Sequence, residues 1–218
     1  MYIIDLFIAI QPHKDIITEK IYKYSRTNFP FDLLNSLDLL NENKISDIDK
    51  TTYISKTAKI EQGVYIGKNC KIYDNALVRK GSIILDNVII GHCSEVSHSV
   101  VFSNTNITHK VSIADSVIGH NCNLGANVVL SNISFLNKDM RNPNLNIKIN
   151  NANISLQKFG SLIGDNTRIG MNSSLDSGCI IGKNSLIYPN TYVRSGEYIN
   201  NSLIKASGKN IIKTHRQL

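Results

Sequence analysis

The sequence predicts an all-β protein built as a left-handed parallel β-helix, and three observations support that prediction. An aliphatic residue recurs every six positions from residue 54 onward, a small or β-branched residue recurs four positions after it, and Gly often follows the aliphatic residue directly. A helix has a period of 3.6 residues and a simple strand a period of 2, so neither produces an unbroken six. Each unit is therefore expected to be a short strand plus a corner, and three units form one turn of a three-sided coil.

Two sets of positions are expected to fill the core of this coil. The aliphatic set is Ile54, Ile60, Ile66, Ile72, Val78, Ile84, Ile90, Val96, Phe102, Ile107, Ile113, Ile118, Leu124 and Leu130, followed by Ile163, Ile169, Leu175, Ile181, Ile187 and Val193. The small set includes Ala58, Val64, Cys70, Ala76, Ser82, Val88 and Ser94, and later Thr167, Ser173, Cys179, Ser185 and Thr191. A narrow prism admits one large and one small side chain per side, so both sets are expected to point inward. The spacing slips around His109, and such a slip re-aims side chains.

Four segments are expected along the chain. Residues 1–48 form an N-terminal cap, in which leucines at helical spacing after Asp32 predict a short amphipathic helix over the open end of the coil. Residues 49–199 form the β-helix, interrupted at 133–160 by a protruding loop whose alternating stretch 146–156 predicts a hairpin. Residues 200–218 form a basic tail.

Composition narrows the class of protein. The chain has 218 residues, a formal charge of +7 and no Trp, so its core must be aliphatic. No apolar run approaches the ~18 residues of a membrane span, and we expect a cytoplasmic protein that binds no membrane. The basic residues are scattered without a nucleic-acid-binding motif, so no nucleic-acid partner is expected.

The four cysteines are interpreted as structural. Cys70, Cys122 and Cys179 lie at small core positions, and Cys93 lies one residue out of phase near a corner. They form no CxxC pair, so a disulfide framework is not expected. None of them is proposed as a nucleophile.

The stretch from Arg79 to Asn132 resembles the acetyltransferase domain of the bifunctional glucosamine-1-phosphate acetyltransferase and N-acetylglucosamine-1-phosphate uridylyltransferase enzymes, above all their archaeal-type relatives. The matching residues are VRKGS (78–82), Glu95, TH (108–109), ADSVIGHNCNLGA (114–126), SN (131–132) and LIGDNTRIG (162–170), and PFDLLNSLDLL (30–40) resembles the linker helix of the archaeal-type relatives. The resemblance implies transfer of an acetyl group from acetyl-CoA to an amino-sugar phosphate, without a metal, in a homotrimer whose CoA groove lies between prisms. The Gly-rich loop of the nucleotidyltransferase domain is missing from this sequence, so uridylyl transfer is not expected.

The same resemblance implies a role for individual residues. His109 matches the general base that takes the proton of the sugar amine, and Asn132 matches an asparagine near the acyl group. The substrate-binding residues that it implies are Arg79, which grips the phosphate, Glu95, Asn123, Lys138 and Arg141. The residues that it implies along the pantetheine arm are Ala126, Met171 and Pro189.

Two departures and three alternatives leave the exact activity open. Ser112 and Ser97 stand where the family has a tyrosine and a phosphate-binding lysine, so the sugar itself is undecided. One alternative is a non-catalytic regulatory or partner β-helix, and another is O-acetylation of a different sugar. The third is a metal enzyme resembling γ-class carbonic anhydrase, although the spacing of the histidines does not reproduce the close His pair of that family. The remaining histidines are expected at corners or on the surface: His13, His92, His98, His120 and His215.

Overall fold

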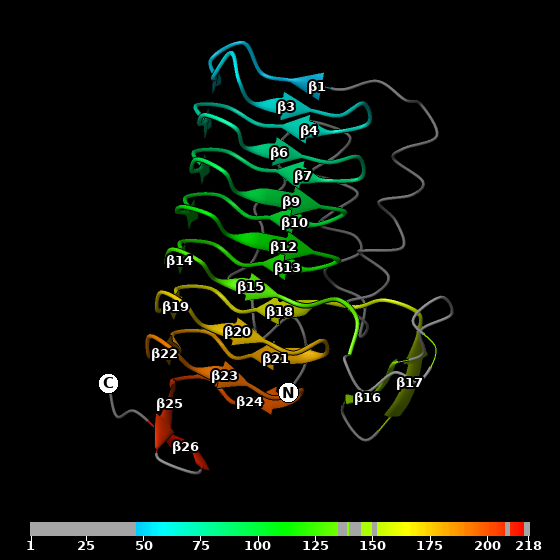
Figure 1. Cartoon of the computed structure of the whole chain (residues 1–218), viewed down its shortest axis with the longest axis vertical. Coiled ribbons are helices and arrows are strands. Elements are labelled where there is room, and N and C mark those ends of the chain that lie inside the picture. Colours follow the sequence, from blue (N-terminus) through cyan, green and yellow to red (C-terminus); the bar gives the residue numbers. More distant parts are fainter. Residues whose placement is uncertain (1–46, 135–138, 140–144, 150–151, 208–209, 216–218) are drawn as a thin grey trace.

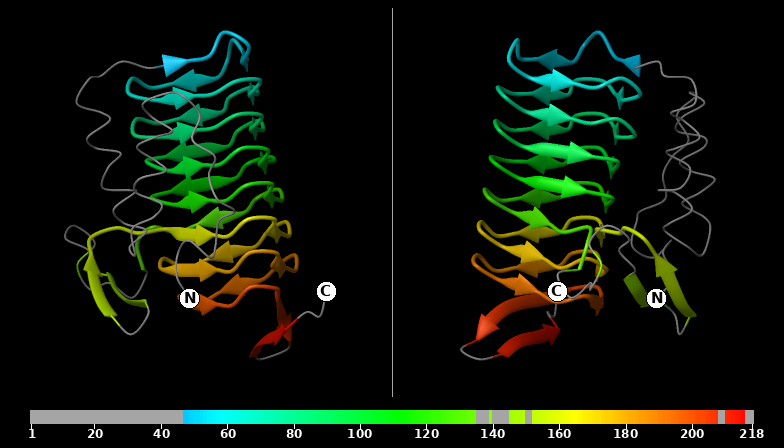
Figure 2. Two further views of the ribbon diagram at one scale, coloured as in Figure 1. Left: turned by 180° about the vertical axis from the view of Figure 1, so that it is seen from behind. Right: turned by 45° about the vertical axis from the view of Figure 1, so that its right-hand side comes forward.

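A computed structural model describes residues 47–134, 139, 145–149, 152–207 and 210–215 of the chain. Within these ranges the secondary structure is all β, and short strands stack into three parallel sheets that form the sides of a prism (Figures 1 and 2). The predicted all-β parallel β-helix is therefore confirmed. The predicted N-terminal helix falls on residues 1–46, outside the described residues.

The chain visits the three sheets in rotation, so that a strand pairs with the strand three positions later, or five positions later across the long insertion within the coils. Sheet A contains β1 (Asp47–Ile48), β4 (Tyr65–Ile66), β7 (Ile83–Ile84), β10 (Val100–Val101), β13 (Val117–Ile118), β18 (Ser161–Ile163), β21 (Cys179–Ile181) and β24 (Gly196–Tyr198). Sheet B contains β2 (Tyr53–Ile54), β5 (Lys71–Ile72), β8 (Ile89–Ile90), β11 (Asn106–Ile107), β14 (Asn123–Leu124), β19 (Arg168–Ile169), β22 (Leu186–Ile187), β25 (Ser202–Ser207) and β26 (Asn210–His215). Sheet C contains β3 (Lys59–Ile60), β6 (Leu77–Val78), β9 (Glu95–Ser97), β12 (Ser112–Ala114), β15 (Val129–Leu130), β20 (Ser174–Leu175) and β23 (Tyr192–Val193).

The core follows the two predicted sets of positions. Large aliphatic side chains stack along each sheet, as Ile66, Ile84 and Ile118 do on sheet A, and these three are fully buried. The small set is buried beside them, including Cys70, Cys122 and Cys179, whereas Cys93 lies exposed at a corner, as expected. Burial raises the pKa of the Cys122 thiol to about 12, which keeps it protonated and unreactive.

One of the two shortened units lies elsewhere than the sequence indicated. Val101 takes the core position of β10 and pairs with Ile84, so the five-residue units run from Val96 to Val101 and from Ile113 to Ile118. The step from Ile113 to Ile118 is as expected, but the other was expected between Phe102 and Ile107, close to His109, and that expectation was wrong. Both shortened units turn the corner from sheet C to sheet A. Phe102 is buried as well, although it follows the core position of the strand.

Two antiparallel hairpins interrupt the regular coils. The first, β16 (Leu145–Ile149) with β17 (Ala152–Leu156), lies in the long connection between β15 and β18, to one side of the prism (Figure 2). The second pairs β25 with β26, and because β25 also pairs with β22, the coil extends beyond residue 199. None of the described segments contains a helix long and apolar enough to cross a membrane.

The stacked core predicts which substitutions unfold the prism. Ile107→Ala removes a fully buried side chain between β8 and β14, and should lower the free energy of unfolding by about 2–5 kcal/mol. Asn106→Ala, at the exposed neighbouring position of the same strand, should change it by no more than about 0.5 kcal/mol. Urea denaturation of both variants tests this, and equal losses would contradict the assigned core.

Candidate active site

Four of the predicted site residues lie on the corner between sheets B and C. His109, Ala126, Met171 and Pro189 occupy equivalent places in successive turns, and we call this row the His109 ridge. Backbone hydrogen bonds hold the turns in register: the amide of Asn127 donates to the carbonyl of His109 at 2.9 Å, and the amide of Asn190 donates to that of Met171 at 2.9 Å. The structure thus brings together the predicted base and the predicted cofactor-binding residues.

The His109 ridge presents an open surface. His109 is exposed, and its ring packs against that of His92 one turn earlier, with 4.3 Å between ring centroids. Met171 and Tyr188 add exposed apolar surface to this corner. Within the described part of the chain, no carboxylate hydrogen-bonds the His109 ring. The ridge offers imidazole and apolar surface, which suits an extended, mostly uncharged chain rather than a compact anion.

A second group of residues lies around the corner between sheets C and A. They line a groove of about 720 Å³, which we call the acceptor groove: Gln62, Gly63, Arg79, Lys80, Glu95, Ser97, His98, Ala114, Asp115, Asn132 and Lys158. Arg79 is held between two carboxylates, with 3.2 Å from its Nη1 to Glu95 and 3.9 Å from its Nε to Glu61. Arg79, Glu95 and Asn132 are therefore gathered in one groove, on the far edge of sheet C from His109.

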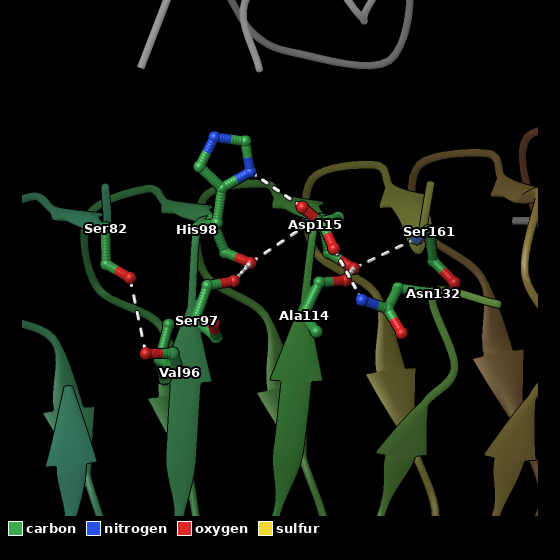
Figure 3. Close-up of polar contacts among 10 residues, drawn as sticks. Ser82, Val96, Ser97, His98, Ala114, Asp115, Asn132 and Ser161 are labelled. Carbon is green, nitrogen blue, oxygen red and sulfur yellow. Dashed lines mark hydrogen bonds and ion pairs between the residues drawn. The ribbon is translucent and has the colours of Figure 1, made fainter. Parts of the chain in front are cut away.

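Two of the residues that line the acceptor groove are a histidine and a carboxylate that form a pair (Figure 3). His98 Nδ1 lies 2.7 Å from Asp115 Oδ1, and Asn132 Nδ2 donates to the other carboxylate oxygen at 2.5 Å. Burial alone would raise the pKa of the Asp115 carboxyl, but the hydrogen bonds from His98 and Asn132 and the positive charges of His98 and Lys158 outweigh it. They hold that pKa below its ordinary value of 3.8, so Asp115 is ionised at neutral pH.

The backbone at this pair departs from the rest of the corner. In four other turns a glycine takes the left-handed conformation here, with φ of 75° at Gly63, 73° at Gly81, 85° at Gly178 and 141° at Gly196. In two consecutive turns His98 and Asp115 take it instead, with φ of 44° and 46°. Glycine takes this conformation without the steric penalty of a Cβ, so these two turns differ from the rest of the corner.

Three predicted substrate residues lie outside these two groups. Asn123 is half-buried on sheet B, between Asn106 and Arg168, next to the His109 ridge and away from the acceptor groove. Lys138 and Arg141 fall outside the described residues. The structure therefore tests neither of these two basic residues against the groove.

The sequence interpretation missed four titratable residues of the acceptor groove. They are Lys80, His98, Asp115 and Lys158. His98 was expected at a corner or on the surface, which describes its place but not its partner. The corner contained a signal that could have revealed the pair. Both residues take a place that glycine holds in neighbouring turns, and both lie in repeat units shortened from six residues to five. No set of three or more His, Cys, Asp or Glu side chains suited to a metal occurs among the described residues.

Comparisons with known proteins agree with this architecture. The family model described as the GMPPB C-terminal domain matches residues 75–159, and the model described as bacterial transferase hexapeptide, six repeats, matches residues 160–195. The bifunctional protein GlmU of Methanococcus maripaludis is 38% identical over 106 residues, which cover 49% of this chain and 25% of that protein. The resemblance to these bifunctional enzymes is confirmed.

The name of a second relative includes an acetyltransferase activity. The bifunctional sugar-1-phosphate nucleotidylyltransferase/acetyltransferase of Sulfurisphaera tokodaii is 32% identical over 104 residues, which cover 48% of this chain and 25% of that protein. The chain thus matches about a quarter of the length of these curated relatives.

The ionised Asp115 predicts a pH-dependent contribution to stability. Because its pKa is lower in the folded than in the unfolded chain, the carboxylate stabilises the fold above pH 3.8, and the effect is lost as pH falls through the folded-state pKa. Asp115→Asn should therefore cost about 1–3 kcal/mol of unfolding free energy at neutral pH and progressively less below about pH 4. Urea denaturation across this range checks the prediction, with the exposed Asp47→Asn as control. A difference that stays constant with pH would contradict it.

Proposed function

We propose that this protein is an acetyl-CoA-dependent acetyltransferase that acetylates the amine of an amino-sugar phosphate, with glucosamine-1-phosphate and galactosamine-1-phosphate as the leading acceptors. The observation that carries the proposal is the mixed charge of the acceptor groove. An amino-sugar phosphate has a negative phosphate and a positive ammonium group. In the groove, Arg79, Lys80 and Lys158 can bind the phosphate. Glu95 and Asp115 can attract the ammonium group.

The size of the acceptor groove supports a small, polar acceptor. Its volume of about 720 Å³ lies within the range of ordinary small-molecule sites. Glu95 and Glu61 contact the half-exposed Arg79, whose planar guanidinium matches the oxygens of a phosphate. Asn132 donates one amide hydrogen to Asp115 and so positions that carboxylate. Its other amide hydrogen is a candidate donor to the acyl oxygen.

The His109 ridge is the proposed site of the acyl donor. Ala126 has only a methyl side chain, and the exposed Met171 offers a flexible apolar surface, which suits the pantetheine arm of acetyl-CoA. His109, exposed on the same corner, is the proposed general base, because an imidazole near the bound thioester can take a proton from the attacking nitrogen. The reaction needs no metal in this scheme.

The two halves face different edges of sheet C, and this arrangement favours a site shared between copies of the chain. A homotrimer in which the His109 ridge of one prism faces the acceptor groove of the next would complete three equivalent sites. The trimer is part of the proposal. Two alternatives stay in view: Ser112 and Ser97, which replace residues of the related enzymes, favour a non-catalytic regulatory β-helix or a hydroxyl acceptor on a different sugar.

The first test is thiol release from acetyl-CoA in the presence of each candidate sugar. Wild-type protein should turn over glucosamine-1-phosphate or galactosamine-1-phosphate faster than UDP-linked amino sugars. His109→Ala should lower kcat by about 100-fold or more, since general base catalysis is typically worth that factor. Equal slow release by both proteins would contradict the role of His109 and favour the non-catalytic alternative.

The second test asks whether the two halves come from different copies. His109→Ala and Arg79→Ala each disable one half of the site, so neither variant alone should be active. After unfolding and refolding together in equal amounts, about a quarter of the sites should combine an intact ridge with an intact groove, and activity should return to about that fraction. Mixed protein as inactive as the separate variants would contradict a shared site.

A further inference from the structure

The ring of His109, the proposed general base, lies exposed on its ridge. A general base is effective only when its ring is held within reach of the proton that it takes. In the acceptor groove, Asp115 orients the ring of His98 in this way, but no carboxylate of the described residues does so for His109. The support for the His109 ring must therefore come from another neighbour on the ridge.

That neighbour is His92, which occupies the equivalent place one turn earlier and is exposed as well. The amide of Lys110 donates to the carbonyl of His92 at 3.0 Å, which fixes the register of the two turns. The two ring centroids lie 4.3 Å apart, and the ring planes are inclined by 35°. Rings at this separation and tilt are stacked, and such pairs are favourable beyond the area that they bury. His92 thus covers one face of the His109 ring.

Gly91 provides a second boundary of the same ring. A Cβ added at Gly91 would lie 1.9 Å from the carbonyl oxygen of Thr108 and 3.2 Å from Nδ1 of His109. The backbones of the two turns therefore approach closely here, and the Nδ1 edge of the ring lies against Gly91. Because Nδ1 faces this backbone, Nε2 is the nitrogen left to accept a proton from a bound amine.

The other members of the corner column do not offer a ring to His109. In the described turns they are Asp74, Ala126, Met171 and Pro189. Asp74 lies one turn before His92, and its carboxylate accepts hydrogen bonds from two hydroxyl groups of the turn before it. Ala126, one turn after His109, has only a methyl side chain. The His109 ring therefore has a planar partner on the side of His92 and a small one on the side assigned to the acyl donor.

We infer that His92 is a positioning residue for this reaction, and that its ring holds the imidazole of His109 in the orientation that presents Nε2 to the acceptor amine. This inference rests on the proposed function. His92 itself exchanges no proton with the amine. Without the stacked ring, the exposed His109 side chain would populate other rotamers, and fewer bound complexes would have the base within reach. The chemical step would slow down, while the binding of both substrates would change little.

A purely structural role is the alternative explanation of the stacked rings. In the later turns of this corner, Asn127 Nδ2 donates to Asn172 at 2.9 Å, and Asn172 Nδ2 donates to Asn190 at 3.2 Å. Cys93 and Lys110 occupy the corresponding places in the two turns of the histidines, so this ladder of amides does not reach them. If the rings only replaced the ladder, their loss would lower stability and leave kcat unchanged.

Three single variants separate the two explanations. His92→Ala removes the ring, and His92→Phe keeps a flat ring without its two nitrogens. Asp74→Asn is the matched control, because Asp74 is exposed in the same column, one turn further from His109. Neither position has a left-handed backbone, so none of these substitutions strains the corner.

The experiment measures kcat and KM by thiol release from acetyl-CoA with the acceptor sugar, together with the urea midpoint of each variant. His92→Ala should lower kcat by about 10-fold and change each KM by no more than about 2-fold. His92→Phe should restore kcat to within about 2-fold of the wild type, and Asp74→Asn should match the wild type. All three should have the wild-type urea midpoint, because both side chains are exposed.

A double variant tests whether His92 acts through His109. His92→Ala combined with His109→Ala should be no slower than His109→Ala alone, because a ring that positions the base has no effect once the base is gone. A side chain with a separate role, structural or catalytic, would cause a further loss in the double variant.

The outcomes separate the inference from the proposed function. A fully active His92→Ala, or a further loss in the double variant, would overturn the inference and leave the acetyltransferase function standing. So would a His92→Phe variant as slow as His92→Ala, because the nitrogens of His92 and not its ring face would then matter. A lowered urea midpoint with kcat unchanged would assign the structural role instead. No turnover by the wild type with any of the sugars would refute the proposed function, and the inference with it.

Discussion

The hydrogen bonding between successive coils is the constraint on which the rest of this structure depends. Each strand is only two or three residues long over most of the prism, and it is held by the strands one turn above and below. A residue therefore lies directly over its equivalent in the next turn, and a position on a corner becomes a column along the whole prism. Because short strands bring little stability of their own, the buried aliphatic stack must supply it.

Because of this register, two corners of the repetitive coil have different chemical character. On the corner between sheets B and C the column contains His92, His109, Ala126 and Met171, and it remains exposed and largely apolar. On the corner between sheets C and A the column is glycine except in the two turns where His98 and Asp115 meet. A change of one residue in the spacing is enough to place a histidine over a carboxylate. The acetyltransferase proposal assigns one ligand to each of these two columns.

Much of this could be predicted from the sequence. The period of six fixed which side chains point inward, because a one-residue shift would place polar side chains in the core, and Ile66, Ile84 and Ile118 lie as expected. Residues that the resemblance singled out at distant places in the sequence, such as His109 and Met171, share a corner column. The resemblance could not separate the ridge from the groove, since a linear motif contains no information about which corner each residue occupies.

The sequence interpretation did not find the pair of His98 and Asp115, and the reason is physical. Val101 and Phe102 are both apolar and both buried, so the pattern alone did not decide which of them continues the core column. Choosing Phe102 moves the shortened unit away from His98 and hides the fact that His98 takes a left-handed corner position. Only the strand pairing of Val101 with Ile84 decides the register, and with it the meeting of His98 and Asp115.

The central claim is that the acyl donor and the acceptor bind at two different corners of the prism and meet between copies of the chain. A crystal structure of the protein with CoA and an N-acetylated amino-sugar phosphate tests it most directly. The account predicts the pantetheine arm along His109, Ala126 and Met171 of one copy, and the sugar phosphate beside Arg79, His98 and Asp115 of its neighbour. Electron density for both ligands at a single corner of one copy, or on sheet B, would contradict it.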